Sequence, residues 1–148
     1  MNTIRPLAMV LSLALAMPLL FTSCRKYADG PTISFRSKEE RIANNWAATF
    51  VFRNNIDETA RYESFNFTFI KSGAFTWTVK PAGATEPVIL TGTWELASVK
   101  EQIKLTYFDA ASAEVRLLYM DILKLYEDEI WLGFISEGDQ YDLKMFPL

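Results

Sequence analysis

Few side chains in this chain are suited to nucleophilic catalysis, because its 148 residues include no histidine and a single cysteine, Cys24. A serine nucleophile needs an adjacent general base, which is most often an imidazole. The serines have no such partner and no surrounding nucleophile-elbow glycines; examples are Ser64, Ser72 and Ser98. We therefore expect no serine or cysteine chemistry of the hydrolase kind.

Carboxylates are the remaining candidates for chemistry. General acid–base catalysis of glycoside hydrolysis needs two carboxylates on opposite sides of a cleft. Candidates are Glu95, Asp121 and Asp142, but the sequence does not indicate that any two of them lie close together. The run Glu127–Glu129 could supply oxygen ligands to calcium, but it lacks the spacing and the glycine of an EF-hand loop. Zinc and copper lack their usual imidazole ligands. The sequence thus predicts no enzyme, no metal site and no cofactor.

The N-terminal residues have the order of a secretory signal. Arg5 is the only charge before an uncharged run from Leu7 to Phe21, and the small pair Thr22–Ser23 precedes Cys24. A signal-peptide core is about 7 to 15 residues long, whereas a membrane-spanning helix needs about 20. We therefore predict a cleaved leader over residues 1–23. This leader is either a lipoprotein signal peptide, which is cleaved before a cysteine that carries lipid, or an ordinary signal peptide followed by an incidental cysteine.

The segment Leu19–Cys24 resembles a bacterial lipobox, with aliphatic residues upstream and a small residue before the cysteine. The resemblance implies a lipid on Cys24, which would be the first residue of the mature protein and its anchor in a membrane. Several acyl chains, at about 0.8 kcal/mol per buried methylene, hold such a protein stably. The resemblance also implies an outer-membrane lipoprotein, and the basic residues Arg25 and Lys26 favour its periplasmic face over the cell surface.

The charge of the chain bears on its partners. The net charge is −3, and loss of Arg5 with the leader makes it one unit more negative. This sign argues against nucleic acid as a partner, because nucleic-acid binding needs basic surfaces. Residues 24–36 contain the turn-forming run Ala28–Pro31 and no periodic apolar pattern, so we expect a flexible tether there. The folded domain is expected over residues 37–148.

The domain is expected to begin with a short helix and to continue as strands. Ser37 and Glu40 have the spacing of a capping box, which predicts a helix through about Asn44 that covers the end of something larger. From Trp46 onward, apolar and polar residues alternate in short runs between turn residues, which is typical of β-strands. The expected strands are Trp46–Arg53, Phe65–Ile70, Phe75–Lys80, Val88–Glu95, Ile103–Tyr107, Glu114–Tyr126, Ile130–Phe134 and Tyr141–Met145.

Three details of these strands carry structural expectations. The two Phe-rich runs around Lys71–Gly73 predict a hairpin, with Gly73 supplying a positive φ at its turn. Gly92 in the middle of a strand predicts a bend or a close backbone approach. The run Glu114–Tyr126 has apolar residues at both odd and even positions. It fits either one strand with a bulge near Asp121 or a helix.

A meander of about eight short strands with almost no helix must hide its edges. Closure into an up-and-down antiparallel barrel achieves this, and a two-sheet β-sandwich is the alternative. The interior of an eight-stranded barrel either is filled by side chains or holds one small ligand. On the alternating pattern, five large rings face inward as candidate ligand-binding residues: Trp46, Phe50, Phe67, Trp77 and Trp94.

Several short motifs occur in a recognisable order. They are Asn44-Asn45-Trp46, the Phe-rich hairpin around Gly73, Thr91–Leu96, Ile103-Lys104-Leu105, Ile122–Leu125 and Glu129–Leu132. Together with the lipobox, this order resembles the lipocalin-like domain lipoproteins of Gram-negative bacteria. The resemblance implies an eight-stranded calycin-type barrel and brings no catalytic residues with it.

The sequence leaves two non-catalytic functions open. The first is a membrane-anchored module that binds a small apolar ligand, such as a lipid or a tetrapyrrole, in the barrel. A cavity of about 300 Å³ or more would favour this function. The second is an accessory or inhibitory module with a filled barrel that contacts an envelope protein. A contiguous exposed apolar patch would favour the second function, and outward apolar residues are expected at Ile70, Ile89, Trp131 and Ile135.

Overall fold

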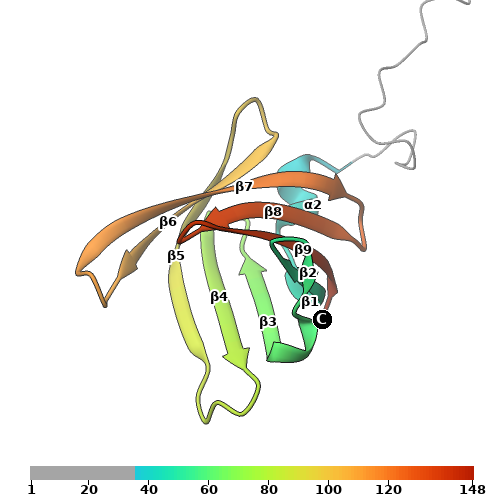
Figure 1. Cartoon of the computed structure of the whole chain (residues 1–148). Helices are drawn as coiled ribbons and strands as arrows, with labels where there is room; N and C mark the ends of the chain where they lie inside the picture. Colours follow the sequence, from blue (N-terminus) through green and yellow to red (C-terminus); the bar gives the residue numbers. More distant parts are fainter. Residues whose placement is uncertain (1–35) are drawn as a thin grey trace, which may run out of the picture.

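The structure is a computed structural model that describes residues 36–148, which form a closed antiparallel β-barrel preceded by one short α-helix (Figure 1). The predicted leader, Cys24 and the tether up to residue 35 lie outside the described residues. The elements are α2 (Lys38–Ile42), β1 (Asn45–Arg53), β2 (Ile56–Asp57), the 3-10 helix η2 (Thr59–Arg61), β3 (Tyr62–Phe69), β4 (Ala74–Pro81), β5 (Val88–Ala97), β6 (Gln102–Asp109), β7 (Glu114–Leu125), β8 (Ile130–Ser136) and β9 (Asp139–Pro147).

The barrel is an up-and-down meander of eight strands, β1 and β3 to β9, and neighbours in this series pair antiparallel. It closes where Trp46–Arg53 of β1 pairs with Tyr141–Pro147 of β9. The predicted barrel is therefore confirmed. The alternative two-sheet sandwich is wrong, because the pairing runs continuously around a ring.

The helix α2 covers one end of the barrel. Ser37 and Glu40 form the predicted capping box, in which the Ser37 hydroxyl accepts from the Glu40 N–H at 3.1 Å. Ile42 is fully buried, and its carbonyl accepts a 2.8 Å hydrogen bond from the indole of Trp46. This bond ties the helix to the start of β1. None of the helices in residues 36–148 has the length and apolar character needed to cross a membrane.

The inward orientation predicted for Phe50 is wrong. The pairing of β1 with β9 shifts register between Ala48 and Phe50, so Thr49 is an extra residue and the faces exchange after it. Val51 is 1% exposed and faces the core, whereas Phe50 is 41% exposed. Phe50 stacks on Phe52 at a ring-centroid distance of 6.3 Å on the outer surface. A β-bulge produces this exchange because side chains alternate strictly with residue number.

The Phe-rich hairpin formed by β3 and β4 is confirmed. Gly73 has a φ of +90° at its turn, which is a conformation that glycine adopts without steric cost. The inward face carries Phe65, Phe67, Phe69 and Phe75, which are all at most 4% exposed, together with the partly buried Trp77.

The long apolar run Glu114–Tyr126 forms the single strand β7, so the helical alternative is wrong. Its register against β8 shifts between Ile122 and Lys124, close to the bulge expected near Asp121. Asp121 is exposed on the outer face and accepts a 2.7 Å hydrogen bond from Gln102.

Buried apolar side chains from every barrel strand fill the interior, and no polar or charged residue among residues 36–148 is buried. Gly92 allows one close approach in this packing. A Cβ built on Gly92 would lie 2.1 Å from the Thr106 carbonyl oxygen and 2.9 Å from the Phe75 ring. The predicted close backbone approach is therefore confirmed.

Candidate functional site

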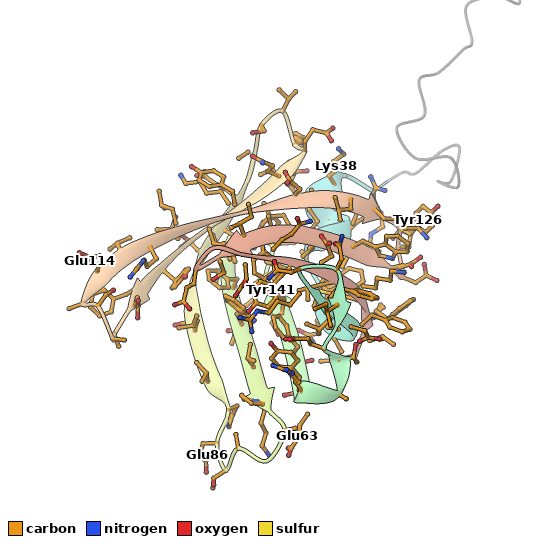
Figure 2. The ribbon with its side chains drawn as sticks, in the orientation of Figure 1. Lys38, Glu63, Glu86, Glu114, Tyr126 and Tyr141 are labelled. Atoms are coloured by element: carbon orange, nitrogen blue, oxygen red, sulfur yellow. The ribbon has the colours of Figure 1, made fainter. Side chains whose placement is uncertain are left out.

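The candidate site is a small cup at the end of the barrel opposite α2. Lys38 on α2 and Glu63 near the start of β3 mark these two ends in Figure 2. The cup has a volume of about 140 Å³. Four strands line it with Tyr62, Phe65, Trp77, Val79, Phe134, Ser136 and Tyr141. Phe65 and Phe134 belong to the buried core and form the inner part of the cup, whereas Tyr62, Val79, Ser136 and Tyr141 lie near the ends of their strands.

The wall of the cup is a chain of five aromatic rings. Tyr62 meets Phe65 edge-on at 5.2 Å, and Phe65 lies 5.7 Å from Trp77. Trp77 meets Phe134 edge-on at 5.9 Å, and Phe134 stacks on Tyr141 at 5.2 Å. Aromatic pairs at these distances stabilise one another beyond simple burial, by about 0.5–1.5 kcal/mol each. The wall is therefore already organised in the free protein.

Tyrosine hydroxyls and charged groups lie around the cup. Burial raises the pKa of the Tyr62 hydroxyl above its ordinary value, and charge and hydrogen-bonding effects of Tyr141 add to the shift. Tyr62 therefore stays protonated at neutral pH and can donate or accept a hydrogen bond. Close to Tyr141, Arg53 donates through Nε to Asp139 at 2.9 Å, and this pairing raises the pKa of Arg53. Arg53 also lies 3.9 Å from Glu58.

The indole of Trp77 differs from the other three indoles. Those of Trp46, Trp94 and Trp131 donate hydrogen bonds to Ile42, Ile70 and Glu129. The Nε1 atom of Trp77 is buried and has no hydrogen-bond partner among residues 36–148. A buried donor without an acceptor is uncommon in native proteins and calls for an explanation.

The five rings chosen from the sequence lie at different heights in the barrel. Trp77 lines the cup. Trp46 and Phe67 are fully buried, and Trp94 is 7% exposed, so these three rings pack in the core and none of them lines the cup. Phe50 lies on the outer surface, as described above.

Sequence reasoning missed most of the cup. The expected strands do not include Tyr62, and they include Phe134 and Tyr141 without a site role. A usable signal was present, because large aromatic residues stand near the ends of their strands, where the barrel can open. The alternation of side chains along a strand shows which face of the sheet a residue is on, but it does not show how far along the barrel axis that residue lies.

Of the carboxylates considered for acid–base chemistry, Glu95 is paired with a lysine, whereas Asp121 and Asp142 line one depression on the outer face. Glu95 accepts from Lys104 at 2.7 Å. Asp121 and Asp142 face outward on either side of Gly133, with which both are in register. Within residues 36–148, no group of three or more metal-ligating side chains is placed to hold an ion. The run Glu127–Glu129 is divided between separate partners, since Glu127 pairs with Arg36 and Glu129 with Lys124, each at 2.7 Å.

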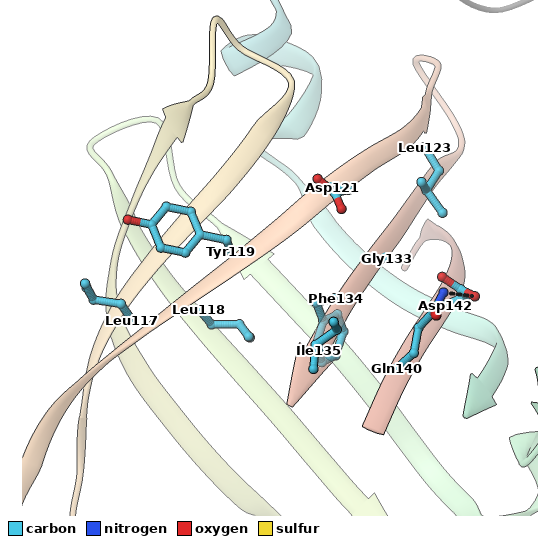
Figure 3. Close-up of a pocket in the computed structure, with 10 residues that line it drawn as sticks. All are labelled: Leu117, Leu118, Tyr119, Asp121, Leu123, Gly133, Phe134, Ile135, Gln140 and Asp142. Atoms are coloured by element: carbon cyan, nitrogen blue, oxygen red, sulfur yellow. Dashed lines mark hydrogen bonds between the residues drawn. The ribbon is translucent and has the colours of Figure 1, made fainter. Parts of the chain in front are cut away.

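A second, larger depression is lined by residues of β7, β8 and β9 and has a volume of about 490 Å³ (Figure 3). The strands β7 and β8 diverge there. Leu117, Tyr119 and Ile135 stand beside the depression, and each is about half exposed or more.

No family model matches this chain, and no curated protein matches it.

Proposed function

We propose that the protein is a membrane-anchored, non-catalytic binding module. In this proposal the barrel-end cup takes one flat aromatic or short branched apolar group, and a polar part of the same ligand meets the tyrosine hydroxyls around the cup. The observation that carries the proposal is the cup itself: five aromatic rings line a half-open space of about 140 Å³ beside an otherwise filled core.

The volume of the cup restricts the ligand. A cavity of about 150 Å³ lined by apolar side chains is large enough to bind benzene. Pockets for whole drug-sized ligands are larger, about 300 to 1,000 Å³. The cup therefore suits one ring-sized group of a ligand whose remainder stays outside, and it is too small for an enclosed lipid or tetrapyrrole.

The indole of Trp77 provides a direct test, with p-cresol as the probe because it combines one flat ring with one hydroxyl. The chain from residue 25 onward contains all of the described barrel and lacks Cys24, so it can be studied without detergent. In a titration followed by nuclear magnetic resonance, we expect a saturable shift of the Trp77 indole N–H signal. The signals of Trp46 and Trp94 should move much less, because both indoles pack in the core.

A matched pair of variants controls for changes elsewhere in the barrel. Val79→Phe adds a ring inside the cup and is expected to abolish the saturable shift. Thr78→Phe adds the same ring at the preceding residue, whose side chain lies on the opposite face of β4 and does not line the cup, and it should leave the shift intact. Equal responses of the two variants, or equal movement of all indole signals, would contradict the proposed site.

The proposed anchor requires a separate test on the full chain in bacterial cells. Cys24→Ser removes the thiol that would carry the lipid, so we expect the protein to leave the membrane pellet and appear in the soluble fraction. The native chain and a Lys26→Ser variant should remain in the pellet. If the Cys24→Ser protein also stays with the membrane, the lipid anchor is refuted, and with it the proposed outer-membrane location on the periplasmic side.

A further inference from the structure

The strand β7 is longer than the neighbour that covers one of its edges. β6 pairs with β7 from Glu114 to Asp121, whereas β8 pairs with β7 only from Met120 to Leu125. In the described part of the chain, residues 114–119 thus have a strand on one side only. Figure 1 shows the orange β6–β7 hairpin extending past β8, and Glu114 marks its tip in Figure 2. We call β7 residues 115–119 the open edge.

The hydrogen bonding of β7 determines which backbone groups face the open side. The N–H of Ile122 donates to the carbonyl of Glu101 at 3.0 Å, on the β6 side. Alternate residues of an antiparallel strand direct their N–H and C=O groups to opposite neighbours. Val115, Leu117 and Tyr119 therefore direct these groups away from β6. A row of unpaired donors and acceptors of this kind is a template for another strand.

Three of the five side chains of the open edge are apolar or aromatic and exposed. Val115 is 67% exposed, Leu117 is 55% and Tyr119 is 48%. Native edge strands are usually protected by lysine, proline or a bulge. The only charge on this edge is Arg116, whose Nε lies 3.4 Å from Asp109 of the same chain. Figure 3 shows the depression beside this edge, where Leu118 and Phe134 are also part of the lining.

We propose that the open edge pairs with the same edge of a second copy of this chain, antiparallel about a two-fold axis at Leu117. In this register Leu117 faces Leu117 of the other copy, and Val115 faces Tyr119 in both directions. Arg116 then faces Leu118, so no like charges are directly opposed, and apolar cross-strand pairs of this kind stabilise a sheet. A register that centres the axis on Arg116 would set two arginines against each other.

The edge is therefore complementary to itself, as a two-fold interface requires. The result is one sheet that continues from the β6–β7 hairpin of one copy into that of the other. This inference is independent of the barrel-end cup. A pairing edge this short belongs to the small, weak class of interfaces, so covalent trapping is the appropriate measurement.

Cysteine cross-linking of the full chain in intact membranes tests the axis. Opposed residues in a hydrogen-bonded antiparallel pair have Cα atoms about 5.5 Å apart, within the range that a disulfide spans. We expect oxidation of Leu117→Cys to give a dimer. Ile89→Cys is a matched control, because Ile89 is 57% exposed on β5, and it should stay monomeric like the native chain. Equal dimer yields from the two variants, or a product whose mass indicates a different protein, would overturn the proposal.

The register supplies a second test that misfolding cannot imitate. Val115→Cys and Tyr119→Cys should cross-link with each other when they are co-expressed with different tags. Each variant alone should give at least several-fold less dimer, because its cysteines would lie far from their counterparts across the axis. Cross-linking that is equally efficient for each variant alone would refute the antiparallel pairing about Leu117.

Discussion

Replacing Phe67 with alanine is expected to destabilise the barrel by about 3 to 5 kcal/mol, the range for removing a fully buried phenylalanine ring. Phe67 is 0% exposed. Its ring stacks on Phe69 at 5.5 Å and on Trp77 at 5.1 Å, so its loss removes contacts from both strands of the Phe-rich hairpin. Chemical denaturation followed by circular dichroism would measure the change in the free energy of unfolding.

Phe50→Ala is the matched control for this prediction. It is the same substitution on a neighbouring strand, but Phe50 is 41% exposed and its ring contacts lie on the outer surface. We expect it to cost less than about 1.5 kcal/mol, since only part of the transfer free energy of an exposed side chain is lost. If the two variants unfold at the same denaturant concentration, the ring of Phe67 contributes no more to stability than the exposed ring of Phe50, which contradicts its placement in the core.

Gly92→Ala is expected to destabilise the barrel by about 3 kcal/mol, at the upper end of the range for overpacking. The added Cβ would stand 2.1 Å from the Thr106 carbonyl oxygen. Because that oxygen belongs to the backbone of β6, no rotation of a side chain relieves the clash. Relief requires β5 and β6 to move apart, which weakens the hydrogen bonding around Gly92 and Tyr107, the residues paired at this point.

Thr91→Ala controls for the loss of local strand preference, because Thr91 is the exposed neighbour of Gly92. Its expected cost is about 1 kcal/mol or less, the full span of strand propensities. Thermal unfolding of the two variants should therefore give clearly different midpoints. A Gly92→Ala protein as stable as Thr91→Ala would mean that β5 and β6 lie farther apart at this point than in the structure.

The elements of the barrel could be predicted from the sequence because the signals that specify them are local. Alternation in Phe65–Phe69 and Phe75–Val79, with Gly73 between them, needs only the two-residue period of a strand and the φ preference of glycine. The capping box of Ser37 and Glu40 is likewise a contact within one turn of helix. Gly92 predicted either a bend or a close backbone approach, and only the structure showed that β5 approaches the β6 backbone there.

Phe50 shows where a local pattern fails. Phe50, Val51 and Phe52 are consecutive and apolar, so either face of the strand could be the buried one. The bulge at Thr49 decides in favour of Val51, and it arises from the pairing of β1 with β9, at the other end of the chain. In β7, by contrast, the exposed Asp121 within an apolar run gave an indication of the nearby irregularity.

By itself the sequence determined the strands, their order as a meander and the aromatic character of the interior, because side-chain alternation and turn residues act over a few positions. Only the tertiary structure decided which rings fill the barrel and which remain at its open end. That outcome depends on the position of each residue along the axis of the closed barrel and on which end of the barrel α2 covers. Likewise, the open edge of β7 exists only because β8 ends before its neighbour does, and the lengths of paired strands are set by contacts between distant segments.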